Sequence, residues 1–187
     1  TMCLPFSTVF FGHQLAGSLL FIAFFLILRV RRDLASLSGG QSALIGLLLG
    51  GAVLSEYTAP ILAAPLALLI APSLWKPPNR ARNCACFLAA ASFAALPLPI
   101  YNMAVFGSPF SVGYAHEANP VMQQKFLGGF LGMSLPSIHQ LFYVTLHPSR
   151  GLFAQAPVLL AALPGYAKLL KDRDWRDAGW LCLYALL

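Results

Sequence analysis

The feature that most constrains this chain is a series of long apolar segments that contain almost no charge. The first, Phe6 to Leu28, runs for about 23 residues, enough for one helix to cross the ~30 Å hydrocarbon core of a bilayer. Hydrophobic residues make up 58% of the sequence and charged residues 10%, and a soluble domain of this size has no interior for helices that are apolar on every face. The sequence therefore predicts an all-α fold, a polytopic transmembrane helix bundle.

Turn and basic residues divide this bundle into about six spans. The segment Ser38 to Trp75 would extend ~57 Å as one helix, nearly twice the membrane core, so we expect it to turn back at Ser55 to Thr58. Pro97 and Pro99 predict a kink in the following span. A long external loop is expected over 107–150, with a short interfacial helix around Leu127 to Tyr143. The predicted spans are 6–28, 38–54, 58–75, 84–106, 151–170 and 179–187, the last one truncated.

The basic residues predict which side of the membrane each turn faces. The net charge is +6, from 12 Lys and Arg against 6 Asp and Glu, and such a surplus normally belongs to cytoplasmic loops. One group ends the first span and another follows the third: Arg29, Arg31 and Arg32, then Lys76, Arg80 and Arg82. Both groups are therefore placed in the cytoplasm and the turn at Glu56 outside. The basic residues form no stripe with interleaved aromatics, which excludes a nucleic-acid partner.

Both ends of the chain lie in or beside apolar sequence, so we expect an internal fragment of a longer protein. The four cysteines lack the spacing of a metal or redox site and are predicted to be small core residues. The histidines His116, His139 and His147 are too unevenly spaced to predict a metal site. No cofactor is predicted, although a carboxylate-bound divalent ion would leave a weaker signature.

Two short motifs have structural interpretations. Leu37 to Gln41 spells LSGGQ, the nucleotide-binding signature of ABC-transporter ATPases, but the required GxxxxGK[ST] partner is missing and the next helix is wholly apolar. ATP binding is therefore rejected. Gly46 and Gly50 form a GxxxG motif, for which we expect close helix packing.

Two ionisable residues lie within or beside the apolar spans. Glu56 is a functional candidate by its depth, and the alternative is a solvated or capping carboxylate at the turn. For His13 we expect a hydrogen-bonded structural role.

The external loop gathers aromatic and hydrogen-bonding groups at one membrane face. Tyr101 and Asn102 are followed by Tyr114, His116 and Glu117. Such mixtures bind sugars, because aromatic rings pack on apolar sugar faces while polar groups bind hydroxyls. An interfacial aromatic belt explains the tyrosines equally well, but it explains His116 and Glu117 less well.

The segment His147 to Gly151 precedes the next span, so we expect Ser149 or Arg150 to open that helix at the outer surface. A helix N-terminus with a forked guanidinium favours phosphate, and a lipid phosphate lies at this depth. The alternative is that Arg150 extends to lipid headgroups with no specific site.

The order of four segments resembles membrane glycosyltransferases of the GT-C type. These segments are FFGHQLAGSLLF, GLLLGGAVLSEYTAPIL, YNMAVFGSPFSVGY and PSRGLFAQAPVLLAALPG. More narrowly, the chain is similar to bacterial relatives of the protein O-mannosyltransferases and of the lipid A aminoarabinose transferase. It departs from these families at the hairpin turn, where they often have a lysine and this chain has Glu56 and Tyr57.

The resemblance implies an inverting transfer, at the external or periplasmic face of a bacterial inner or plasma membrane, from a polyprenyl-phosphate-linked sugar to a glycan, lipid or protein acceptor. The catalytic base is expected in an acidic first external loop that would precede Thr1, so the fragment alone is expected to be inactive. The donor phosphate is assigned to Arg150, Gly151 and His116. The sugar or acceptor cleft is assigned to Tyr101, Asn102, Tyr114, Glu117 and Glu56.

Two other classes remain open from the sequence. A secondary transporter or lipid flippase also uses broken helices and an intramembrane carboxylate, but places them near the membrane midplane and has a matching second half. A non-catalytic membrane scaffold needs no polar external cluster.

Overall fold

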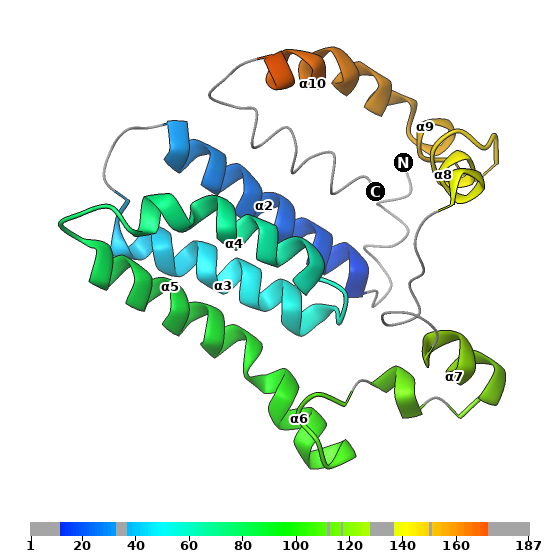
Figure 1. The fold of residues 1–187 in the computed structure, drawn as a ribbon, viewed down its shortest axis with the longest axis horizontal. Coiled ribbons are helices and arrows are strands. Elements are labelled where there is room, and N and C mark those ends of the chain that lie inside the picture. Colours follow the sequence, from blue (N-terminus) through cyan, green and yellow to red (C-terminus); the bar gives the residue numbers. More distant parts are fainter. Residues whose placement is uncertain are drawn as a thin grey trace. The chain divides into compact units, whose positions relative to one another are not determined.

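The computed structural model describes residues 12–32, 37–111, 113–116, 118–127, 137–149 and 151–171. Within these residues every regular element is a helix, which confirms the all-α class (Figure 1). The chain divides into two compact units, each described by itself. Residues 11–133 form the bundle unit, and residues 1–10 and 134–187 form the second unit. The predicted span 179–187 and the start of span 6–28 lie outside the described residues.

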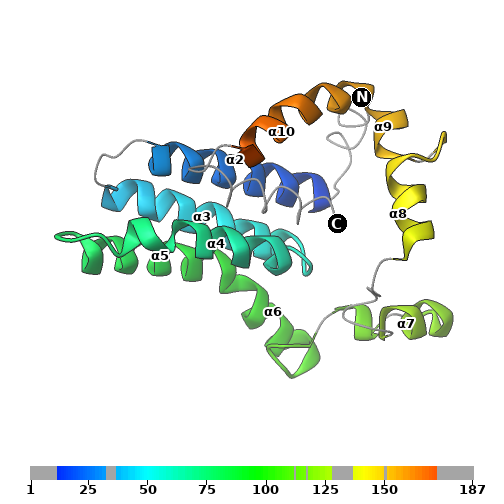
Figure 2. The same cartoon turned by 45° about the horizontal axis from the view of Figure 1, so that its top comes forward.

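Four helices of the bundle unit run alongside one another in alternating directions (Figures 1 and 2). They are α2 (Gly12–Arg32), α3 (Gly39–Ser55), α4 (Pro60–Leu74) and α5 (Arg80–Ala95). The central helix is α3, because the two most extensive helix contacts of the unit are those that it makes with α5 and with α2. The chain continues into α6 (Pro97–Phe106), a 3-10 helix η1 (Gly113–His116) and α7 (Pro120–Leu127).

The helix ends follow from local sequence. Ser38 caps α3: its hydroxyl accepts from the Gln41 N–H at 3.1 Å, while the Gln41 side chain accepts from the Ser38 N–H at 2.9 Å. The LSGGQ residues therefore start a helix. Pro60 stands at the first position of α4, where its missing N–H costs nothing. Gly107 ends α6 with a φ of 73°, a left-handed conformation that glycine adopts readily.

The GxxxG motif lies where α3 packs on α5. A Cβ atom added at Gly46 would lie 2.3 Å from the Phe87 carbonyl oxygen, and one added at Gly50 would lie 2.3 Å from that of Ala91. Only glycine allows the two backbones to approach so closely. The predicted role of this motif in close helix packing is confirmed.

The outer faces of the bundle are as apolar as its interior. On α2 the buried residues recur at helical spacing, and they are Ala16, Leu20, Ala23 and Ile27. Its exposed residues are also large and apolar, including Leu15, Phe21, Ile22 and Phe25. Water does not favour such a surface, whereas lipid does. By length and composition, two helical stretches, Gly12–Arg31 and Arg80–Phe106, are suited to cross a membrane.

The other apolar helices are shorter. With 17 and 15 residues, α3 and α4 extend about 25 and 22 Å, less than the ~30 Å core. They occupy the segments where the two arms of a hairpin were expected. Helix α5 begins at Arg80, four residues before the expected start at Cys84. Its junction with α6 falls at Leu96, where Pro97 and Pro99 remove backbone donors, as the kink prediction required.

One end of the bundle carries the basic groups. We call it the basic end and define it by Arg29, Arg31, Lys76, Arg80 and Arg82. Two hydrogen bonds fix it: Arg31 Nη1 donates to the Leu69 carbonyl at 3.1 Å, and Asn83 Nδ2 donates to the Leu37 carbonyl at 2.9 Å. The helix ends that the positive-inside rule assigned to one side are therefore neighbours in the fold.

The second unit contains short helices. They are α8 (Ile138–Thr145), α9 (Leu152–Gln155), the 3-10 helix η2 (Pro157–Ala161) and α10 (Ala162–Lys171). The single helix expected over 151–170 is thus three pieces. Pro157 lacks an N–H and forces Ala156 to a φ of −136°, outside the helical region, which ends α9. Helix α8 overlaps the end of the interfacial helix expected over 127–143.

Candidate functional site at the polar end of the bundle

The end of the bundle opposite the basic end gathers hydrogen-bonding side chains. We call it the polar end and define it by His13, Glu56, Tyr57, Thr58 and Asn102, together with the loop residues 107–111 and 113–116. The start of α2, the turn between α3 and α4, and the end of α6 bring these residues together. Glu56 is the only acidic residue among those that the structure describes.

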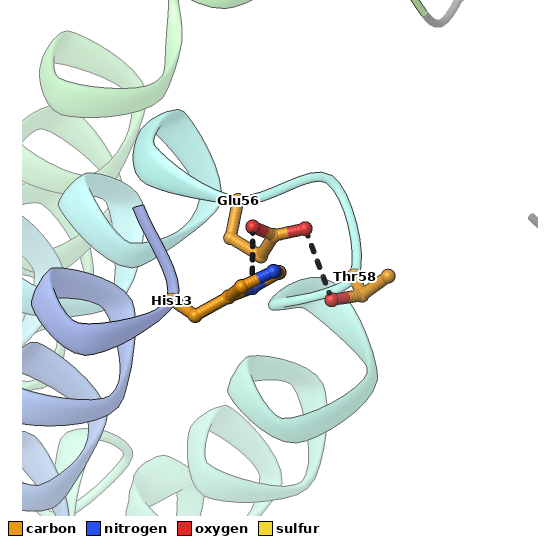
Figure 3. Close-up of polar contacts among 3 residues, drawn as sticks. All are labelled: His13, Glu56 and Thr58. Atoms are coloured by element: carbon orange, nitrogen blue, oxygen red, sulfur yellow. Dashed lines mark hydrogen bonds and ion pairs between the residues drawn. The ribbon is translucent and has the colours of Figure 1, made fainter. Parts of the chain in front are cut away.

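The Glu56 carboxylate lies between two partners (Figure 3). Its Oε2 atom lies 2.8 Å from His13 Nδ1, and its Oε1 atom accepts from the Thr58 hydroxyl at 3.3 Å. The Glu56 side chain is 11% exposed and that of His13 is 60% exposed. A nearly buried carboxylate thus orients an imidazole that remains accessible, an arrangement that selects which ring nitrogen carries the proton.

Backbone geometry explains how His13 reaches Glu56. Glu56 is the C-terminal cap of α3, where an extended backbone conformation ends the helix. A Cβ at Gly12 would lie 2.6 Å from the Ser55 carbonyl oxygen. Gly12 therefore lets the start of α2 approach the end of α3, and the next residue, His13, meets the carboxylate.

Asn102 ties the same turn to the loop after α6. It is 3% exposed, its Oδ1 accepts from the Tyr57 hydroxyl at 3.1 Å, and its Nδ2 donates to the Pro109 carbonyl at 3.3 Å. A buried amide is stable only when its polar atoms are bonded in this way. Asn102 thereby fixes the loop against the α3–α4 turn.

An aromatic group stands beside this amide. The rings of Phe106 and His116 stack with centroids 4.3 Å apart and an interplanar angle of 4°, and Ser111 Oγ lies 2.9 Å from His116 Nε2. Tyr101 packs edge-on against Phe106, with ring centroids 6.2 Å apart. Tyr101 is 57% exposed and can therefore contact a ligand.

The structure brings together four residues of the predicted site: Glu56, Tyr101, Asn102 and His116. Glu117 and Arg150 lie outside the described residues, as does the side chain of Tyr114. Gly151 belongs to the second unit, where it caps the four-residue helix α9 and its N–H donates to the His147 carbonyl at 2.7 Å. The donor-phosphate assignment to Arg150, Gly151 and His116 stays a prediction.

The polar-end residues that were not assigned to the site from the sequence include His13, Tyr57, Thr58 and Ser111. His13 has the hydrogen-bonded environment that was expected of it, but its partner is the candidate residue Glu56. The pair Gly12-His13 was the available signal, since a glycine beside a polar residue at a helix start allows close approach to another backbone. Among the described residues, no three His, Cys, Asp or Glu side chains lie together as metal ligands.

Comparison of the chain with protein families, with curated proteins and with solved structures gives no match. The fold and the site define a helical protein with two stretches suited to a membrane and one polar end. The glycosyltransferase resemblance stays a prediction.

Proposed function

We propose that the chain is part of a multi-spanning membrane glycosyltransferase, which moves a sugar from a polyprenyl-phosphate donor to an acceptor at the external face. The basic end would then face the cytoplasm, by the positive-inside rule, and the polar end would face the periplasm or exterior. The protein would reside in a bacterial inner or plasma membrane.

The observation that carries this proposal is the position of the polar side chains. The buried polar residues of the described bundle lie toward its two ends: Ser42, Ser73 and Asn83 toward the basic end, and Asn102 at the polar end. The interior between them is apolar. A transporter needs binding groups near the membrane midplane, whereas an enzyme acting on a lipid-linked headgroup needs them at the membrane surface. The arrangement therefore favours the transferase.

The polar end offers the groups that such an enzyme requires. The exposed ring of Tyr101 suits the apolar face of a sugar, and the Glu56 carboxylate with its His13 partner suits an acceptor hydroxyl. In the reaction the hydroxyl oxygen attacks the anomeric carbon, the bond to phosphate breaks, and polyprenyl phosphate leaves. The hydroxyl proton passes to the base expected in the preceding loop. Stabilising the departing phosphate, the role assigned to Arg150, Gly151 and His116, lowers the barrier most because negative charge develops there.

A transfer assay on the full-length protein tests the proposal. Membranes containing the protein would be supplied with a panel of radiolabelled polyprenyl-phosphate hexoses and pentoses, and label would be followed into glycan, lipid and protein fractions. We expect donor-dependent transfer, abolished by Arg150→Ala with expression intact. Uptake of the same sugars into sealed vesicles, without transfer, would instead establish a transporter.

Two buried asparagines provide a matched pair of variants. Asn102→Leu and Asn83→Leu each remove a nearly buried amide, at 3% and 2% exposure, from opposite ends of the continuous α5–α6 segment. If catalysis belongs to the polar end, Asn102→Leu should lower the transfer rate by at least about tenfold, while Asn83→Leu should leave it close to wild type. If both variants lost the same share of the transfer rate, the polar end would have no special role in catalysis. If the wild-type protein transferred sugar from none of the donors, the proposal would be overturned.

A further inference from the structure

A cavity of about 300 Å³ lies at the basic end, where α4 ends and α5 begins. It is lined by Trp75, Arg80, Ala81 and Cys84. Because it opens at the far end of the bundle from Glu56 and Asn102, the proposed transfer reaction does not use it.

The surroundings of this cavity are cationic. Lys76, Arg80 and Arg82 are all exposed. The one acidic residue that the structure describes, Glu56, lies at the opposite end. An anion at Arg80 would therefore bind at an end of the bundle that carries further positive charge and no described carboxylate. The guanidinium also offers a planar fork of donors, which matches two oxygens of a phosphate group.

The cavity also carries an aromatic group suited to a membrane interface. Trp75 is 67% exposed, and its indole combines an apolar body with an N–H donor, as favoured at the level of lipid headgroups. The cavity has the volume of about ten water molecules at ~30 Å³ each, enough for a phosphate with its glycerol. The exposed apolar residues Leu68 and Leu88 on α4 and α5 would continue this surface toward the acyl chains.

We propose that this cavity binds the headgroup of an anionic phospholipid of the cytoplasmic leaflet. Arg80 binds the phosphate, Lys76 adds charge, and Trp75 packs against the glycerol. Basic pockets between transmembrane helices on the cytoplasmic side bind such headgroups, so charge, position and shape agree with this occupant. The inference rests on the proposed membrane orientation and not on sugar transfer.

Cys84 provides a direct test, because this residue lines the cavity and a bound headgroup would hinder access to it. The full-length protein would be placed in nanodiscs of phosphatidylcholine alone or with phosphatidylglycerol. Alkylation by a maleimide would be followed at each cysteine by peptide mass spectrometry, with Cys86, two residues further along α5, as the internal reference. We expect phosphatidylglycerol to slow alkylation of Cys84 by about tenfold relative to Cys86, as strong occupancy of the cavity requires.

Arg80→Gln and Arg82→Gln form the decisive pair of variants. Both remove one exposed positive charge from the same helix turn, but only Arg80 lines the cavity. Arg80→Gln should abolish the protection of Cys84, and Arg82→Gln should keep most of it. If both variants lost the protection of Cys84 equally, general electrostatic attraction of the lipid to the surface would explain the protection, and the proposed site would be wrong.

Two other outcomes would also overturn the proposal. Protection of Cys84 by excess inorganic phosphate in phosphatidylcholine nanodiscs would indicate a small-anion site. Equal alkylation of Cys84 in both kinds of nanodisc would indicate that no headgroup occupies the cavity. A transfer assay on the Arg80→Gln protein separates this inference from the proposed function, because loss of the lipid site should leave sugar transfer measurable.

Discussion

Replacing Gly46 or Gly50 with alanine should separate α3 from α5 and destabilise the bundle. The added Cβ would lie 2.3 Å from a carbonyl oxygen of α5 in each case, whereas ordinary contacts begin at 3.4 Å. The opposing atom belongs to the backbone and cannot rotate away. The helices must therefore move apart by about 1 Å, and the packing along the interface loosens with them.

The magnitude follows from two opposing terms. Overpacking of this kind costs about 1–3 kcal/mol, while alanine gains up to about 1 kcal/mol over glycine in helix propensity. Because the clashing atom is a backbone oxygen, the upper part of that range applies, about 2–3 kcal/mol, and subtracting the gain in helix propensity leaves a net loss of about 1–2 kcal/mol for each variant. For a chain of 187 residues, this corresponds to a fall in Tm of about 3–6 °C.

Thermal unfolding of the purified protein in detergent, followed by circular dichroism, measures the effect. Gly17→Ala is the matched control, because no atom lies within 4 Å of a Cβ added at that position of α2. That variant should keep or raise the Tm. The close-packing argument would be refuted if Gly46→Ala and Gly50→Ala both unfolded at the wild-type Tm. It would also be refuted if Gly17→Ala lowered the Tm as much as they do.

Substitutions at three further residues test individual contacts by the same unfolding measurement. Tyr57→Phe removes the donor to buried Asn102 Oδ1 and should cost about 1–2 kcal/mol, so an unchanged Tm would mean that the bond contributes nothing. Glu56→Ala should cost about 1–2 kcal/mol by removing the acceptor for His13 and Thr58, whereas Glu56→Gln keeps an acceptor oxygen and should lose about half as much. Asn83→Leu should change the free energy of unfolding by less than about 1 kcal/mol. The lost hydrogen bond to the Leu37 carbonyl is offset by removal of Asn83 Oδ1, a buried acceptor for which the described residues supply no donor. A larger loss would show that this oxygen has a partner.

Features encoded in neighbouring residues could be predicted from the sequence. The all-helical class follows from the apolar runs, and the hairpin turn follows from Ser55 to Thr58 and Pro60, because these signals act over one or two helical turns. The GxxxG contact also has a local signature. What the motif could not supply was the partner helix: any neighbour with small residues would suit Gly46 and Gly50, and only the fold selects α5.

The candidate site was predictable by composition but not by its contacts. Tyr101, Asn102 and His116 stood out as a polar and aromatic group, yet His13 and Glu56 are far apart in the sequence. Their contact depends on the register between α2 and the α3–α4 hairpin, which a shift of one residue on either helix would abolish. Similarly, Pro157 was visible in the sequence, but whether it kinks a long helix or ends a short one depends on the packing around it.

The close packing of α3 on α5 also positions the polar end. Tyr57 follows α3 and Asn102 lies on α6, which continues α5, so their 3.1 Å bond joins the two helices just beyond the Gly50 contact. A displacement of about 1 Å there would lengthen the bond to about 4 Å, past the range of a hydrogen bond. Tyr57→Phe should therefore cost about 1–2 kcal/mol in the wild-type protein but less than about 0.5 kcal/mol in the Gly50→Ala background, a coupling measurable by a double-mutant cycle. If the two losses in the free energy of unfolding were additive, the loop would follow the displaced helix and keep its hydrogen bond. The packing of α3 on α5 would then not determine the geometry of the polar end.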